Sequence, residues 1–156
     1  MKTFSLSAHD MNMEAVEKAD HQRLIEVWEA SVRATHDFLA EADLQALKPL
    51  ILNQYFDAVD LTCVKNPKGE ILGFSGVHDH NIEMLFIAPQ ARGQGIGTLL
   101  ATHAINTQSA THVDVNEQNE QALGFYLHLG FTVTGRSPLD GQGKPYPLLH
   151  MTLTHK

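Results

Sequence analysis

The sequence predicts an α/β (α+β) fold in which a sheet of six to seven strands packs against several helices. Short segments with apolar residues at a period of two are typical of strands, and longer ones with a period near 3.6 are typical of helices. A strand, a glycine-rich turn and a helix also follow one another directly at residues 82–105. In chain order the segments read β-α-α-β-β-β-α-β-α-β-β, so strands and helices are interleaved along the whole sequence.

The N-terminal third predicts one strand and two helices. Asn12–Ala19 is the first expected strand, and Asp20 is a plausible N-cap for a helix that ends near Val32. One face of that helix carries Leu24, Val27, Trp28 and Ser31. A second helix is expected over residues 41–56, with a break or kink at Pro49.

Period-two segments dominate the remainder of the chain. Further strands are expected at residues 61–65, 70–77, 82–87, 111–115, 131–136 and 148–154. The first two form a hairpin through the turn Asn66-Pro-Lys-Gly69. Helices are expected from the glycine turn to about residue 108 and over residues 118–129, where Gly130 suits the C′ position. Residues 138–147 are rich in Gly and Pro and predict a loop.

Composition narrows the class of protein. The 156 residues are 43% apolar, without an apolar run long enough for a membrane span, so a soluble domain is expected with no membrane partner. A single cysteine and a polar N-terminus without signal-peptide features predict a cytoplasmic protein. The net charge of −7 argues against nucleic acid as a partner and favours cationic ligands such as amines. We expect residues 1–11 to be a loose extension and residues 12–156 to form one domain, as a monomer or homodimer.

The glycine turn predicts an anion site. Gly93, Gly95 and Gly97 lie between a strand and a helix, and glycine lets backbone N–H groups approach a ligand closely. The first N–H groups of a helix lack intrahelical partners and lie at the positive end of its dipole, which suits phosphate. A P-loop is excluded because no Lys follows the glycines. A partial Rossmann-type nucleotide site stays open, with Thr98 at its third glycine position and Asp114 as its acidic residue.

Two motifs resemble a known family. Gln90-Ala-Arg-Gly93-Gln-Gly95 is similar to the Gln/Arg-x-x-Gly-x-Gly/Ala signature of the GNAT superfamily of acetyl-CoA-dependent N-acetyltransferases. Val115-Asn116-Glu-Gln-Asn119-Glu-Gln-Ala-Leu-Gly-Phe125-Tyr126-Leu-His-Leu-Gly130-Phe131 resembles the family's second signature. The resemblance is clearest over residues 70–135, and it implies a mixed, mostly antiparallel sheet with helices on both faces. A bacterial subgroup of poorly defined substrate has similar segments at residues 35–39 and 143–151.

The resemblance implies acetyl-CoA as cosubstrate and direct attack of a primary amine on it in a ternary complex. Backbone amides of residues 93–98 would hold the pyrophosphate, and the strand at residues 85–87 would pair with the pantetheine arm. The implied cofactor-binding residues are Leu85, Phe86, Ile87, Arg92, Gly93, Gln94, Gly95, Ile96, Gly97, Thr98, Asn119 and Tyr126. Asn119 could instead only cap the following helix, as Asn116 is expected to do.

The reaction needs a neutral amine, an oxyanion donor and a proton for the leaving thiolate. The resemblance implies Tyr126 as the general acid, a role that suits a phenol, which is protonated at neutral pH. The family's carboxylate base aligns with Asn81, which cannot act as a base, so Glu83 on the same strand face is the candidate. Other candidates are His78, His80, His112, Asp114 or ordered water.

The acceptor is expected to be a small amine or a protein lysine or N-terminus. Candidate acceptor-binding residues are His36, Phe38, Asn81, Asp114 and Tyr146. No metal is expected, because the ten histidines form no cluster with Cys or carboxylates, and Cys63 is expected to be an inert buried thiol. A non-catalytic protein that binds or senses acyl-CoA is the alternative function.

Overall fold

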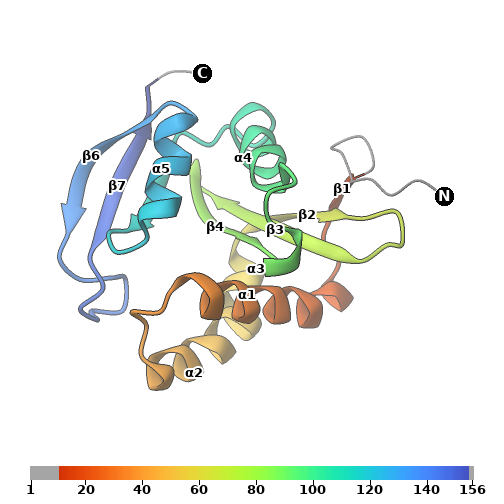
Figure 1. Ribbon diagram of the computed structural model, residues 1–156, viewed down its shortest axis with the longest axis horizontal. Helices are drawn as coiled ribbons and strands as arrows, with labels where there is room; N and C mark the ends of the chain where they lie inside the picture. The colour runs from red at the N-terminus through yellow and green to blue at the C-terminus, as the bar shows by residue number, and fades with distance from the viewer. Residues whose placement is uncertain (1–10, 155–156) are drawn as a thin grey trace.

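A seven-stranded sheet in the order β1-β2-β3-β4-β5-β7-β6 runs through the computed structural model, which describes residues 11–154 (Figure 1). The strands are β1 (Asn12–Ala15), β2 (Asp60–Lys65), β3 (Ile71–His78), β4 (Asn81–Ile87), β5 (His112–Asn116), β6 (Phe131–Ser137) and β7 (Leu148–Leu153). Only the pair β4 and β5 is parallel, so the sheet is mixed and mostly antiparallel, as predicted.

Helices cover both faces of this sheet (Figure 1). The α-helices are α1 (His21–Thr35), α2 (Glu41–Leu50), α3 (Phe56–Ala58), α4 (Ile96–Asn106) and α5 (Glu120–His128). Shorter helical turns are η2 (Lys18–Asp20), η3 (Ile51–Tyr55) and η4 (Pro89–Ala91). α1, α2 and α3 lie on one face and α4 and α5 on the other, which confirms the predicted arrangement of layers.

The N-terminal elements differ from the prediction in detail. β1 ends at Ala15 rather than Ala19, because the turn η2 follows it. Asp20 stands at the N-cap position of α1, but its carboxylate accepts the backbone N–H of Glu17 (2.9 Å), so it closes η2 and does not cap α1. Residues 1–10 of the expected extension lie outside the described residues, and Met11, its last residue, is buried in the core.

Pro49 changes the helix without ending it. The helical path continues from α2 through η3, a π-helix, into α3. Proline has no N–H to donate and its ring crowds the preceding turn, so Pro49 costs α2 one backbone hydrogen bond, and the wider turn follows at Ile51–Tyr55. The predicted helix over residues 41–56 is therefore present, with its irregularity placed just after Pro49.

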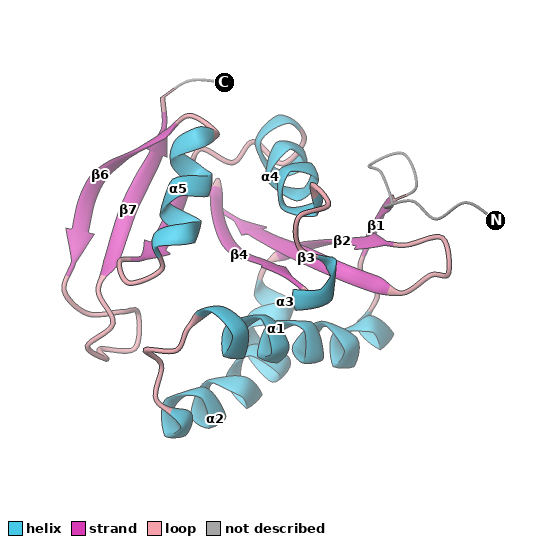
Figure 2. Cartoon of the chain, viewed as in Figure 1, coloured by secondary structure: helices cyan, strands magenta, loops and turns pink. Residues whose placement is uncertain are grey.

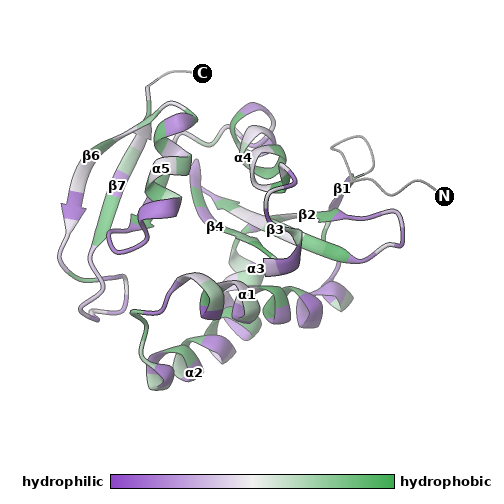
Figure 3. Ribbon diagram, viewed as in Figure 1, coloured by the Kyte–Doolittle hydropathy of each residue, from purple (hydrophilic) through white to green (hydrophobic). Residues whose placement is uncertain are grey.

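The core lies between the sheet and both helical layers, and green apolar segments concentrate there in Figure 3. Leu24 of α1, Phe74 of β3 and Leu100 of α4 are fully buried in one cluster. Cys63 is also fully buried, and burial raises the pKa of its thiol to about 11, as expected of an unreactive cysteine. A second cluster beneath α5 contains Phe131. No helix within residues 11–154 has the length and apolarity to cross a membrane.

The sheet opens at the junction of β4 and β5. The two strands pair only at Asn81 with His112 and at Ile82 with Val113. Beyond Ile82 they separate, which leaves one edge of β4 unpaired. β4 also carries a bulge, because the neighbours Gly76 and Val77 of β3 pair with Met84 and Ile82, so Glu83 is the extra residue.

Candidate functional site

A cleft of about 430 Å³ occupies the gap between β4 and β5. It collects most of the residues that the sequence singled out, from five different segments of the chain. They are His36, Glu83, Leu85, Phe86, Ile87, Arg92, Gly93, Gly95, Ile96, Gly97, Thr98, Asp114, Asn119 and Tyr126. Four predicted residues, Phe38, Asn81, Gln94 and Tyr146, do not line the cleft directly.

The glycine loop forms one end of the cleft. Gly93 and Gly95 have positive φ angles of 79° and 82°, and a Cβ atom at either position would meet nothing within 4 Å. Among the described residues, none accepts a hydrogen bond from the backbone N–H groups of residues 93–98. These donors stand at the N-terminus of α4, where the helix dipole adds partial positive charge. The loop can therefore bind an anion such as a diphosphate.

The open edge of β4 forms one wall. The N–H of Ala88 donates to the carbonyl of Leu72 in β3 (2.8 Å). Backbone groups point alternately to the two sides of a strand, so Leu85 and Ile87 direct their N–H groups away from β3, toward the gap. An extended ligand with amide groups can pair with this edge as an added strand.

Tyr126 closes the cleft from α5. Its side chain is only 6% exposed, and its ring packs edge-on against Phe125 and Phe131 at 5.0 and 5.6 Å. Burial raises the pKa of Tyr126, so the phenol keeps its proton at neutral pH. Of the two neighbouring aromatic residues, Tyr126 is buried and Phe125 is partly exposed. Phe125 lines the cleft, and its ring would lie 3.4 Å from a Cβ atom at Gly97.

The two asparagines of the second motif have separate structural roles. Asn119 is the N-cap of α5, where its side chain accepts the N–H of Ala122 (3.1 Å), and it also lines the cleft. Asn116 was expected to cap α5, and this was wrong. Its side chain accepts the N–H of Gln118 (3.1 Å) and forms a turn before the helix.

An aromatic wall stands beside the cleft at the C-terminal end of α1. The ring of Phe38 lies 5.1 Å from that of His36 and 6.2 Å from that of Tyr146. Tyr146 donates to Asp43 of α2 (2.5 Å) and accepts the N–H of Ala40 (3.1 Å), which fastens the loop at residues 138–147 to the start of α2 (Figure 2). Burial, followed by the nearby Arg92, lowers the pKa of His36, which favours its neutral form.

Glu83 and Asp114 are the carboxylates of the cleft. Asn81 donates to Glu83 (3.0 Å), so the two side chains share a face, as predicted. The other candidate bases, His78, His80 and His112, do not line this cleft. Within residues 11–154, no group of three or more His, Cys, Asp or Glu side chains is placed to hold a metal ion.

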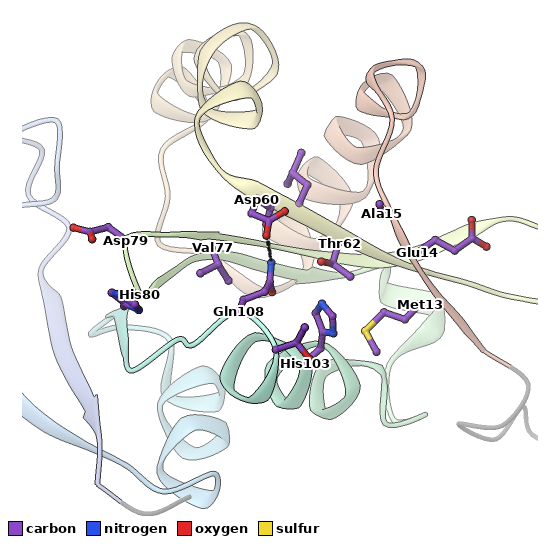
Figure 4. A pocket seen from close by; sticks show the side chains of 12 residues that line it. Met13, Glu14, Ala15, Asp60, Thr62, Val77, Asp79, His80, His103 and Gln108 are labelled. Atoms are coloured by element: carbon purple, nitrogen blue, oxygen red, sulfur yellow. Dashed lines mark hydrogen bonds between the residues drawn. The ribbon is translucent and has the colours of Figure 1, made fainter.

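A second hollow lies on the opposite side of β4, between the first three strands and α4 (Figure 4). Its volume is about 690 Å³. Gln108 donates to the carboxylate of Asp60 (3.0 Å) across it, and His80 hydrogen-bonds the carbonyl of Ser109 (2.9 Å). None of the residues predicted to bind cofactor or acceptor lines this hollow.

Sequence reasoning missed several residues of the cleft. Ser31 and Thr35 line it from the last turns of α1, one helical turn apart, so a helical wheel extended to residue 35 would have placed them together. Gln121 lines it from α5 and accepts a hydrogen bond from Arg92 (3.3 Å). No sequence pattern links Arg92 to Gln121, because the contact depends on how α5 sits against the glycine loop.

Comparisons with known proteins point in one direction. A family model described as an acetyltransferase (GNAT) domain matches residues 8–154. Peptidyl-lysine N-acetyltransferase YjaB of Salmonella typhimurium is 40% identical over 141 residues, which cover 90% of this chain and 97% of that protein. YjaB of Escherichia coli is 41% identical over 130 residues, covering 83% and 88%.

Solved structures share the fold. The solution structure of apo-form YjaB from Escherichia coli superposes with a TM-score of 0.84 at 36% identity, covering 94% of this chain and 99% of that one. The PaiA N-acetyltransferase of Thermoplasma acidophilum, crystallised in complex with coenzyme A, superposes with a TM-score of 0.70 at 16% identity, covering 92% and 98%.

Proposed function

The chain belongs to the GNAT acetyltransferase family, and on that premise we propose that it moves the acetyl group of acetyl-CoA to the side-chain amine of a protein lysine. The observation that carries this proposal is the row of backbone N–H groups at residues 93–98, which have no acceptor among the described residues and open onto the same cleft as Tyr126. Peptidyl-lysine as acceptor class is taken from the names of the two similar YjaB proteins.

The residues present fit acetyl-CoA. The free N–H groups of the glycine loop suit its diphosphate, and the unpaired β4 edge suits the two amides of its pantetheine arm. When bound, acetyl-CoA supplies a thioester that an amine can attack, with release of a thiolate. The N–H of Ile87 faces the gap and is the proposed donor to the thioester oxygen. Arg92 and Asn119 also line the cleft and complete the proposed contacts.

Tyr126 is the proposed general acid. Its raised pKa keeps the proton on the phenol, and within residues 11–154 its hydroxyl has no hydrogen-bond partner that would compete for it. A phenol that is held still by two aromatic rings can donate to a thiolate without reorganisation.

Glu83 is the proposed base. A lysine amine has an ordinary pKa of about 10.4, so it enters the cleft as an ammonium and must lose a proton before it attacks. Glu83 is the extra residue of the β4 bulge, it shares a face with Asn81, and its carboxylate lines the cleft. The aromatic wall of His36, Phe38 and Tyr146 would hold the aliphatic part of the lysine side chain.

Isothermal titration with acetyl-CoA, followed by thiol release with lysine-containing peptides, tests the proposal. We expect binding with one site per chain and peptide-dependent thiol release. The protein's only thiol, Cys63, is buried and does not interfere with the assay. Tight binding of acetyl-CoA without thiol release from any amine would instead indicate a protein that binds or senses acyl-CoA.

A further inference from the structure

Three side chains from three strands form a hydrogen-bonded chain next to the cleft. His150 of β7 bonds Asp114 of β5 through Nδ1 (2.6 Å to Oδ1) and Ser137 of β6 through Nε2 (2.6 Å to Oγ). Asp114 and His150 stand directly opposite each other in the sheet. On the other side, His150 lies over Gly135, where an added Cβ atom would come within 3.5 Å of its ring.

The chemistry of the three groups fixes the direction of the hydrogen bonds. An ionised carboxylate can only accept, so Nδ1 of His150 carries the proton that bonds Asp114. In the neutral ring Nε2 is then an acceptor, and the hydroxyl of Ser137 donates to it. Each member is therefore oriented by the next, and the chain ends at Asp114 Oδ2, which has no partner within the described residues.

The order Ser-His-Asp is that of hydrolase triads, but Ser137 is not suited to be a nucleophile. The next residue is Pro138, which lacks the N–H that commonly stabilises the oxyanion at a nucleophilic serine. Ser137 also does not line the cleft, whereas Asp114 does. The member of this hydrogen-bonded chain that can contact a ligand is therefore the carboxylate of Asp114.

We propose that Asp114 binds the ammonium group of the incoming lysine. His150, held in place by its hydrogen bond to Ser137, is the positioning residue that orients the free Oδ2 of Asp114 toward this ammonium. This inference rests on the proposed function and names a subsite within it. The side chain of Asp114 is 40% exposed, open enough to meet a ligand. A carboxylate held in one rotamer loses less entropy on binding than a mobile one, and an ammonium forms a charge-assisted hydrogen bond with it.

The two carboxylates of the cleft, Asp114 and Glu83, have different hydrogen-bond partners and therefore different proposed roles. Asp114 already accepts a hydrogen bond from His150 on Oδ1, which fixes its rotamer and leaves Oδ2 to accept from a cation. Glu83 accepts a hydrogen bond from the amide of Asn81 (3.0 Å) and is the proposed base. One carboxylate binds the ammonium and the other deprotonates it.

Isothermal titration of a lysine peptide into the full chain saturated with coenzyme A tests this without any turnover. The peptide carries one lysine and a blocked N-terminus. Asp114→Asn keeps the shape and removes the charge, and we expect peptide affinity to fall about tenfold or more. Coenzyme A affinity should stay unchanged. Thr152→Val is the matched control, since the Thr152 hydroxyl lies on the same strand as His150 but bonds Thr134 (3.0 Å) and not Asp114.

Variants of His150 distinguish a role in orienting the Asp114 carboxylate from a role in packing alone. His150→Phe removes the donor to Asp114 and should weaken peptide binding in the same direction as Asp114→Asn. His150→Asn retains an N–H near the position of Nδ1 and should restore most of the affinity. The double variant Asp114→Asn/His150→Phe should bind no more weakly than Asp114→Asn alone, because His150 acts through Asp114.

Two results would overturn the inference. One is wild-type peptide affinity in Asp114→Asn. The other is an equal loss of peptide affinity in His150→Phe and His150→Asn, together with a loss of coenzyme A affinity. That result would mean that the hydrogen bonds among Ser137, His150 and Asp114 only support the fold. If instead peptide binding follows the expected order but no acetylation occurs, the proposed function fails and this subsite stands.

Discussion

The cleft between β4 and β5 and the hollow beside α4 differ in how their polar groups are used. The hollow is larger, about 690 Å³ against about 430 Å³. Several of its polar side chains are paired within the protein, as Gln108 is with Asp60 and Glu14 is with Lys65 (3.3 Å). The cleft instead exposes backbone donors that the fold leaves unused, on the glycine loop and on the β4 edge.

The volume of a hollow is therefore a poor guide to the position of the functional site in this protein. Polar groups that are already paired offer little to a ligand, since a new bond only replaces an existing one. Donors without a partner in the protein gain a bond when a ligand arrives, and those at the N-terminus of α4 gain it from an anion. If a ligand binds through these free donors, changes at the glycine loop should affect binding more than changes in the hollow.

The largest effect is expected at the glycine loop. Gly95→Ala places a methyl group where a diphosphate would lie, and we expect acetyl-CoA affinity to fall about tenfold or more. Gly69→Ala is the matched control, because Gly69 has the same φ of 82° and equally empty surroundings but lies in the β2–β3 turn. Both variants should lose about 1–2 kcal/mol of stability, and only the first should lose affinity. Equal acetyl-CoA affinities of Gly95→Ala and Gly69→Ala in isothermal titration would contradict this prediction.

Tyr126→Phe should lower kcat about a hundredfold, the usual scale of a lost general acid, with acetyl-CoA affinity unchanged. Its hydroxyl has no hydrogen-bond partner within residues 11–154, so the stability cost should be small. Tyr55→Phe is the control, since that hydroxyl only accepts a bond from Gln142 (2.9 Å) outside the cleft. Steady-state kinetics of the two variants measure this difference in kcat. Full activity in Tyr126→Phe would show that Tyr126 is not the general acid.

A smaller effect is expected in the hollow, and on stability alone. Gln108→Ala removes the hydrogen bonds to the carbonyl and carboxylate of Asp60 (3.2 and 3.0 Å), which should cost about 1 kcal/mol of unfolding free energy. Urea denaturation measures this loss. kcat/KM should not change, and a large fall would show that the hollow takes part in the reaction.

The smallest effect concerns pH. The pKa of His36 is lowered mainly by burial in the cleft wall and secondly by Arg92, so the unfolded chain binds a proton more readily than the folded one. Stability should therefore be complete above about pH 6.5 and decline as the pH falls below that value. His36→Asn should reduce this decline in thermal unfolding at pH 5 relative to pH 8. An identical pH dependence in the variant would exclude a contribution from His36.

The sequence predicted regular elements well because their signals are local. The alternation of apolar and polar residues predicted the strands, and residues 93–97 alone predicted the glycine loop. The features that place side chains in the site were not local. The bulge at Glu83 depends on how β4 pairs with β3, and which of Phe125 and Tyr126 is buried depends on how α5 docks.

The Ser137–His150–Asp114 chain shows the same limit more sharply. Its members come from three strands and are brought together by sheet order β5-β7-β6 and by a register shift in β6 between Val133 and Gly135. A shift of one residue would turn these side chains to the other face. Asp114 was therefore identifiable as a candidate, whereas its two partners were not.

A titration of ¹⁵N-labelled protein with coenzyme A, followed amide by amide in NMR spectra, identifies the backbone N–H groups that meet the cofactor. We predict that the largest shifts fall on residues 93–98 and on Leu85 and Ile87, with little change around His103 and Gln108. Shifts concentrated in the hollow, with residues 93–98 unmoved, would contradict it.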